Sequence, residues 1–135
     1  MKKVNLILCC FLLITSLYAQ KSFRCFDCDN NIKLKISVEY LNDTPISVKY
    51  KGQTSSIPLK LIKGSQKTVT GYSTTEESYN EILNGQINGK YIFTHSGNWD
   101  YIVYIRKDDV KFNFTINLNE SIKPSGDGYR ETPCY

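Results

Sequence analysis

Histidine, tryptophan and methionine are nearly absent from this sequence, which has 135 residues and one of each. A zinc site made from histidine and cysteine needs a tetrahedral set of ligands, and His95 is the only imidazole. The chain has no glycine-rich phosphate loop between a strand and a helix and no Gly-x-Ser-x-Gly motif. His95, Ser96 and Asp100 are residue types of a catalytic triad, but neighbours along one strand point to opposite faces. The sequence therefore predicts neither an enzyme nor a metal or cofactor site.

A large excess of one charge is also missing. The sequence has 17 lysine and arginine residues against 13 aspartate and glutamate residues, for a net charge of +4. Lys2 and Lys3 lie in the segment that export would remove, so the remaining chain keeps a charge of about +2. Basic and acidic residues are interspersed along the chain. A bias this small does not indicate binding to nucleic acid or to an acidic membrane surface.

Long apolar runs are confined to the start of the chain. A basic tip precedes an apolar stretch over residues 4–18, which is followed by the small residue Ala19. These are the parts of a secretory signal, so we expect residues 1–19 to be removed and Gln20 to begin the mature chain. The stretch is shorter than the ~20 residues that a transmembrane helix needs. No second apolar run follows, so the mature chain is expected to have no transmembrane segment.

Cys9 and Cys10 offer an alternative to cleavage after Ala19, because a lipid-attached cysteine also follows a short apolar segment. The residue before Cys9 is Leu8, where lipidation requires a small residue. We therefore favour the plain signal peptide, in which both cysteines act as small apolar residues. A basic start and a compact signal are typical of bacteria, which predicts an exported protein of the periplasm or the extracellular space.

Three cysteines follow the signal: Cys25 and Cys28 in the segment 20–31, and Cys134 at the end of the polar tail over 119–135. Exported proteins meet an oxidising compartment, so pairing is expected. Cys25 and Cys28 have the Cys-x-x-Cys spacing of redox and zinc sites, but neither a helix start nor a full ligand set accompanies them. We predict that Cys134 pairs with Cys25, with Cys28 as the alternative partner, and a Cys25–Cys28 bond stays open. A bond to Cys134 would tie the tail back to the domain.

Residues 32–118 alternate between apolar and polar residues in most stretches, which is typical of strands with one face in a core. The clearest runs cover residues 32–40, 46–50, 87–95 and 110–118. Asn42-Asp43, Asn84-Gly85 and Ser96-Gly97-Asn98 are expected turns. Residues 76–83 fit either a short helix or a strand, and the strand is favoured because its neighbours are strands. We predict an all-β domain, a small antiparallel meander of roughly seven or eight strands that closes as a barrel or folds as a sandwich.

The hairpin that begins at Ser96 is where we expect contact with a partner. The strand after the turn is apolar on both faces, which predicts that it is covered on both sides. Its core residues are expected to be Trp99, Tyr101, Val103 and Ile105, with Tyr104 packed on the other side. A rigid strand that ends in a small polar turn presents a contact loop with little entropy left to lose. The contact candidates are Ser96, Asn98, Trp99, Tyr104, Arg106 and Lys107.

The N-terminal half resembles the C-type lysozyme inhibitors of bacterial periplasms, the membrane-bound and periplasmic inhibitor family. The resemblance lies in Phe23-Arg24-Cys25, Val38-Glu39-Tyr40-Leu41-Asn42-Asp43, Val48-Lys49-Tyr50-Lys51-Gly52-Gln53 and Ile57-Pro58-Leu59. It implies a small antiparallel β-barrel in which a terminal cysteine, here Cys134, is bonded to Cys25. It also implies an inhibitory Ser-Gly-x-x-Tyr loop that enters the lysozyme cleft. The nearest segment here runs from Ser96 to Tyr101 and is longer than that motif.

These features together predict an exported, non-catalytic binding or interaction module whose partner is an extracytoplasmic protein. A structural component of a cell-surface assembly and a lysozyme-inhibitor-like protein are the alternatives. A binding module should have a localised patch or groove at the Trp99 turn. An assembly subunit should instead have a long, uncharged strand at a free sheet edge.

Overall fold

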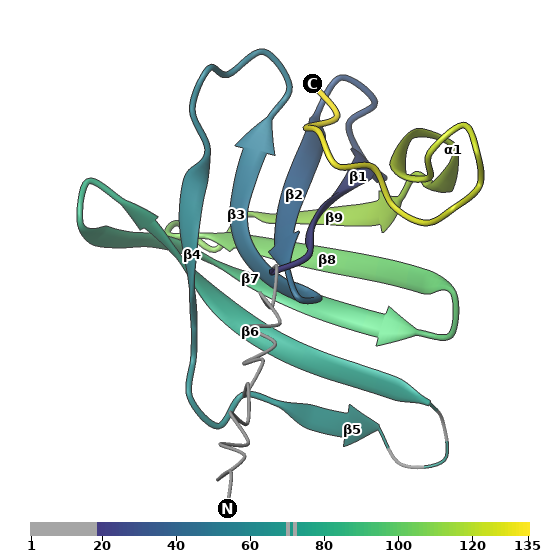
Figure 1. The fold of residues 1–135 in the computed structure, drawn as a ribbon. Coiled ribbons are helices and arrows are strands. Elements are labelled where there is room, and N and C mark those ends of the chain that lie inside the picture. The colour runs from purple at the N-terminus through teal and green to yellow at the C-terminus, as the bar shows by residue number, and fades with distance from the viewer. Residues whose placement is uncertain (1–18, 70, 72) are drawn as a thin grey trace, which may run out of the picture.

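The computed structural model describes residues 19–69, 71 and 73–135. Most of the expected signal segment, with Cys9 and Cys10, lies outside these residues. Within them the chain is almost entirely β, with one short helix, α1 (Leu118–Ser121), near its end (Figure 1). The strands are β1 (Lys21–Cys28), β2 (Lys35–Leu41), β3 (Thr44–Tyr50), β4 (Ile57–Leu61), β5 (Lys67–Val69), β6 (Thr74–Leu83), β7 (Gln86–Ser96), β8 (Trp99–Arg106) and β9 (Lys111–Ile116).

Eight of these strands close into one antiparallel barrel. Neighbouring strands follow the order β4-β3-β2-β1-β9-β8-β7-β6, and β4 pairs with β6 to complete the ring. The short strand β5 pairs with the first residues of β6, beyond the part of β6 that pairs with β4 (Figure 1). The predicted all-β class is therefore confirmed, and the barrel is the architecture that forms. Closure pairs the strand edges that an open sheet would leave free.

Two of the tight turns follow directly from the sequence. Asn42 and Asp43 join β2 to β3 with φ angles of 49° and 61°. Asn84 and Gly85 join β6 to β7 with φ angles of 51° and 74°. Positive φ at both central residues matches the twist of the flanking strands, and asparagine, aspartate and glycine tolerate it best. Residues 76–83 lie in β6, so the strand interpretation of that segment is confirmed.

The barrel begins earlier in the chain than predicted. The β domain was expected to start at residue 32, but β1 pairs with both β2 and β9 and so is part of the ring. β1 is buried on both faces, so its side chains show no apolar–polar alternation to mark a strand. Ile32 was predicted to face the core, and it is instead 85% exposed in the β1–β2 connection.

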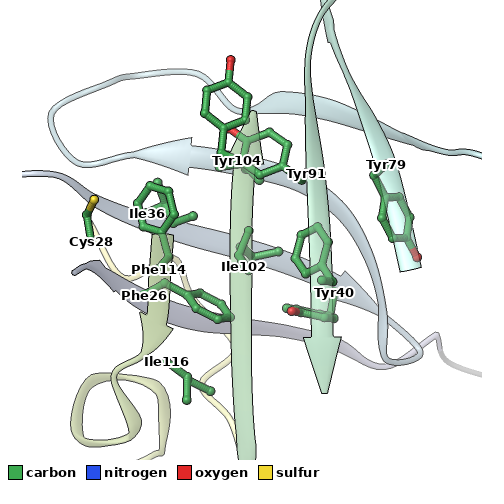
Figure 2. Packing of buried hydrophobic residues seen from close by; sticks show 13 residues of the cluster. Phe26, Cys28, Ile36, Tyr40, Tyr79, Tyr91, Ile102, Tyr104, Phe114 and Ile116 are labelled. Carbon is green, nitrogen blue, oxygen red and sulfur yellow. The ribbon is translucent and has the colours of Figure 1, made fainter. Parts of the chain in front are cut away.

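The interior of the barrel is filled by aromatic and branched aliphatic side chains. Figure 2 shows Phe26, Ile36, Ile102 and Phe114 gathered between the strands that contribute them. Each of the four is at most 1% exposed. Burying a side chain of this size contributes about 1.5–3 kcal/mol, so these contacts are the main source of the stability of the barrel. An eight-stranded barrel is just wide enough for its own side chains to fill it.

The face of β8 that points into the barrel is the opposite of the predicted one. Asp100, Ile102 and Tyr104 point inward and are between 1% and 5% exposed. Trp99 and Tyr101, which were predicted to fill the core, are 48% and 42% exposed on the outside. A strand with apolar residues on both faces does not specify its inner face by periodicity, and here the cross-strand partners decide it. Ile102 lies opposite Phe93 of β7 and Phe114 of β9.

The C-terminal tail covers the outer face of β1 and β2 (Figure 1). A disulfide joins Cys25 to Cys134, which confirms the predicted pairing, and Cys28 is a buried free thiol inside the barrel. The backbone N–H of Phe23 donates to the carbonyl oxygen of Arg130 at 2.9 Å. The backbone N–H of Cys25 donates to the Ser121 hydroxyl at 2.8 Å. The tail thus buries one face of a strand that no second sheet covers.

Gly89 of β7 is required by its neighbour inside the barrel. A Cβ atom at this position would lie 2.5 Å from the ring of Tyr104. That ring cannot move freely, because its hydroxyl donates to Glu81 at 2.7 Å and its face stacks on Tyr91. We therefore expect Gly89→Ala to destabilise the protein by about 1–3 kcal/mol through overpacking. The urea midpoint of unfolding measures this, with Lys90→Ala as the neighbouring control. Equal midpoints for the two variants would contradict the prediction.

Candidate functional site

One end of the barrel is hollowed, and this hollow is called the mouth below. It has a volume of about 400 Å³. The β2–β3 turn and the ends of β6, β7 and β8 surround it. Its ionisable lining residues, apart from tyrosines, are Arg24, Asp43, Glu77, His95 and Asp100. Its aromatic lining residues are Tyr40, Phe93, Tyr101 and Tyr129.

Arg24 is the central residue of the mouth. It points inward from β1, and its side chain is only 11% exposed. Its Nη1 donates to the Asp100 carboxylate at 2.9 Å, and its Nη2 donates to Asp43 at 2.9 Å. The guanidinium lies 4.0 Å from the ring centroid of Tyr40 and 4.3 Å from that of Tyr129. A planar guanidinium with two carboxylates and two aromatic rings as neighbours is held in one orientation.

The electrostatics of Arg24 follow from these contacts. Burial by itself lowers the pKa of the guanidinium, since desolvation disfavours the charged form. The interactions with Tyr40 and Asp100 outweigh that effect, so the pKa of Arg24 is raised above its ordinary value. Arg24 therefore carries a permanent charge inside the barrel, and the side chain of Asp100, only 7% exposed, is its buried counter-ion.

His95 and Asp100 form a second interaction across the β7–β8 pair. They are opposite residues in the register, and His95 Nδ1 lies 2.6 Å from the second oxygen of Asp100. The side chain of His95 is 56% exposed, so its ring reaches solvent at the rim of the mouth. Ser96 points to the other face, where its hydroxyl bonds to that of Thr74 at 2.8 Å. The two faces thus separate Ser96 from the His95–Asp100 pair, as expected from strand geometry.

The contact candidates from the sequence analysis do not come together. Ser96, Asn98 and Trp99 lie at the mouth end of β8, beside the β7–β8 turn. Arg106 and Lys107 lie at the opposite end, where Arg106 pairs with Asp108 at 2.5 Å. Tyr104 is inside the barrel. Along a strand of this length the two ends are about 20 Å apart, so these residues cannot form one compact site.

Four residues of the mouth were not predicted to belong to a binding site: Arg24, Tyr40, Asp43 and Asp100. Arg24 and Asp100 are separated by 76 positions in the sequence, and only barrel closure brings them together. One signal was present in the sequence. Arg24 interrupts an otherwise apolar stretch over residues 23–26, and a charged residue in such a stretch is expected to have a buried partner.

A second polar cluster lies inside the opposite end of the barrel. Glu81 is 2% exposed, and its carboxylate accepts hydrogen bonds from the Tyr104 hydroxyl at 2.7 Å and from Asn88 Nδ2 at 2.8 Å. The Tyr91 hydroxyl donates to it at 3.2 Å and also bonds to the hydroxyl of Tyr50 at 2.7 Å. Burial raises the pKa of Tyr50 to about 12, so this phenol stays protonated at neutral pH. Because its donors are all supplied from within the barrel, this cluster is a structural one.

In the part of the chain that the structure describes, no group of three or more His, Cys, Asp or Glu side chains is placed to hold a metal ion. Among the same residues, no helix has the length and apolar character needed to cross a membrane. A comparison of the chain with protein-family models, with curated proteins and with solved structures gives no match.

Proposed function

We propose that this protein is an exported, non-catalytic binding module whose ligand site is the mouth of the barrel. The observation that carries the proposal is the arrangement around Arg24. A buried charge fixed by Asp43, Asp100 and two tyrosine rings, next to a hollow of about 400 Å³, is a preformed polar site. Ligand sites are typically concave and largely preformed, with a few placed polar groups on an apolar wall.

The packed interior supports placing the ligand at the mouth. Tyr91, Phe26 and Ile36 are 0% exposed, so side chains already occupy the middle of the barrel. A preformed rim that is fixed by a rigid barrel loses little entropy when a partner binds. Export is supported by the Cys25–Cys134 disulfide, because such bonds persist in oxidising compartments.

The structural-component alternative requires a long, uncharged strand at a free edge. Among the described residues, the strand outside the ring is β5, which has three residues and begins with Lys67. A short strand with a lysine is a poor template for edge-to-edge pairing. A binding role is therefore the better supported of the two.

The lysozyme-inhibitor-like alternative has one specific observation in its favour. The resemblance implies a bond between Cys25 and Cys134, and that bond is present. An inhibition assay with a C-type lysozyme tests the alternative directly. Inhibition that is lost on replacing Ser96 and Asn98 by alanine would favour it over the mouth as the contact site.

A capture experiment with two matched double variants tests the proposed site. The mouth variant combines Asp43→Asn with His95→Ala, two residues whose side chains are 86% and 56% exposed. The control combines Arg106→Ala with Lys107→Ala at the opposite end. The unaltered protein is first used to recover a partner from native envelope. We expect this partner to bind the mouth variant at least about tenfold more weakly than it binds the unaltered protein, and to bind the control variant as well as the unaltered protein. Loss of binding in the control alone would refute the mouth as the site.

A further inference from the structure

We propose that the mouth binds a cationic group, the ammonium of a lysine or the guanidinium of an arginine that a basic partner protein inserts into it. This inference rests on the proposed binding site and names the chemistry of its ligand. Its first support is the charge of the lining. Three carboxylates, those of Asp43, Glu77 and Asp100, face one guanidinium, that of Arg24. The carboxylates outnumber the guanidinium, so the mouth is negative, whereas the mature chain as a whole is slightly positive.

Arg24 does not change this charge preference. Each of its terminal nitrogens donates to a carboxylate, and its Nε is buried without a hydrogen-bond partner among the described residues. Its two faces lie against Tyr40 and Tyr129. An anion that entered the mouth would meet three carboxylates around this one guanidinium, which disfavours a phosphate or carboxylate ligand on electrostatic grounds.

The mouth keeps one free carboxylate oxygen as a hydrogen-bond acceptor. Asp43 is 86% exposed and uses one oxygen for Arg24, so its second oxygen faces solvent. Glu77 adds negative charge to the hollow, although its two oxygens accept from Gln66 Nε2 and from the Tyr79 hydroxyl, each at 2.6 Å. An exposed carboxylate oxygen together with a second carboxylate charge matches a positively charged ligand that carries N–H donors.

The Tyr40 hydroxyl provides an independent indication of a ligand. Tyr40 is only 3% exposed and lines the mouth, yet its hydroxyl forms no hydrogen bond with another described residue. Unlike Arg24 Nε, this oxygen is not fully buried, so it is accessible from the hollow. Polar groups of buried side chains are nearly always paired. A ligand N–H in the hollow would supply the missing partner.

The size of the hollow favours a side chain as the occupant. A volume of about 400 Å³ is at the small end for ligand pockets, large enough for one or two side chains and open to solvent at the barrel end. The partner would then contact the rim around the β2–β3 and β7–β8 turns while its basic residue enters. Free diamines share this cationic chemistry, and the experiment below separates the two sources.

The test is a nuclear magnetic resonance titration of the ¹⁵N-labelled mature chain, with its disulfide intact. The probes are acetyl-Gly-Arg-Gly-amide, the same peptide with citrulline, the same peptide with glutamate, and 1,4-diaminobutane. Citrulline is the matched control because it keeps the shape of arginine and removes its charge. We expect the arginine peptide to change the chemical shifts of the backbone amides of Asp43, His95 and Asp100. Its affinity should be at least tenfold higher than that of the citrulline peptide and should fall as the salt concentration rises.

A mouth variant completes the experiment. Glu77→Gln should lower the affinity for the arginine peptide at least threefold and leave the affinity for the citrulline peptide unchanged. Asp108→Asn at the opposite end of the barrel should change neither affinity. If the citrulline or glutamate peptide shifts the mouth amides as strongly as the arginine peptide does, the cationic ligand is refuted and the mouth remains the site. Tighter binding of the diamine than of the peptide would refute a protein partner. If every probe leaves the mouth amides unmoved, the proposed site is refuted as well.

Discussion

Replacing both Cys25 and Cys134 by alanine is expected to destabilise the protein by about 4–5 kcal/mol. The bond links residues 109 positions apart, so it constrains almost the whole unfolded chain. The loss of entropy on closing so long a loop is borne by the unfolded state, and removing the bond stabilises that state. A small domain has a total stability of about 5–15 kcal/mol, so the variant should be near the limit of folding.

Urea unfolding of this variant is best compared in a Cys28→Ala background. Cys28 is a buried free thiol, and removing it prevents exchange with the other two cysteines. Alanine at position 25 avoids burying a hydroxyl, since Cys25 is 0% exposed. Amide exchange should also become fast at Phe23, whose N–H donates to the tail. A stability loss below about 1 kcal/mol would show that the remaining tail contacts hold β1 without the bond.

Replacing Arg24 by methionine is expected to destabilise the protein by about 3–5 kcal/mol. The substitution leaves the Asp100 carboxylate, 7% exposed, without its buried counter-ion. It also removes the guanidinium from between the rings of Tyr40 and Tyr129. Thermal or urea unfolding at neutral pH measures the effect.

Two further variants identify its cause. Combining Arg24→Met with Asp100→Asn should recover more than about 1 kcal/mol, because the unpaired charge is then gone. Arg106→Met removes a surface ion pair whose side chains are 48% and 55% exposed, so its effect should stay below about 1 kcal/mol. If Arg24→Met and Arg106→Met are equally stable, the prediction is contradicted, and water reaches the Arg24–Asp100 ion pair more freely than its burial indicates.

The candidate site was harder to predict than the strands because its residues come from segments that are far apart in the sequence. Arg24 comes from β1, Asp43 from the β2–β3 turn and Asp100 from β8. No local pattern links them, since each stands among residues that suit its own strand or turn. The predicted contact site, by contrast, took all of its residues from one continuous segment of the sequence. Its candidates lie along β8 from one end of the barrel to the other, so they did not converge.

The sequence by itself determined the all-β class and the tight turns, and it favoured a bond from Cys134 to Cys25 over the alternative partner Cys28. Period-2 alternation in β2, the Asn-Asp and Asn-Gly turns and the presence of cysteines after an export signal are local or compositional signals that need no knowledge of neighbouring strands. Only the tertiary structure decided which face of β8 points inward and where the mouth lies. With apolar residues on both faces, periodicity leaves β8 undetermined. The buried position of Asp100 is stable because Arg24 arrives from a strand far away in the sequence to neutralise it, and barrel closure is what places the two 2.9 Å apart.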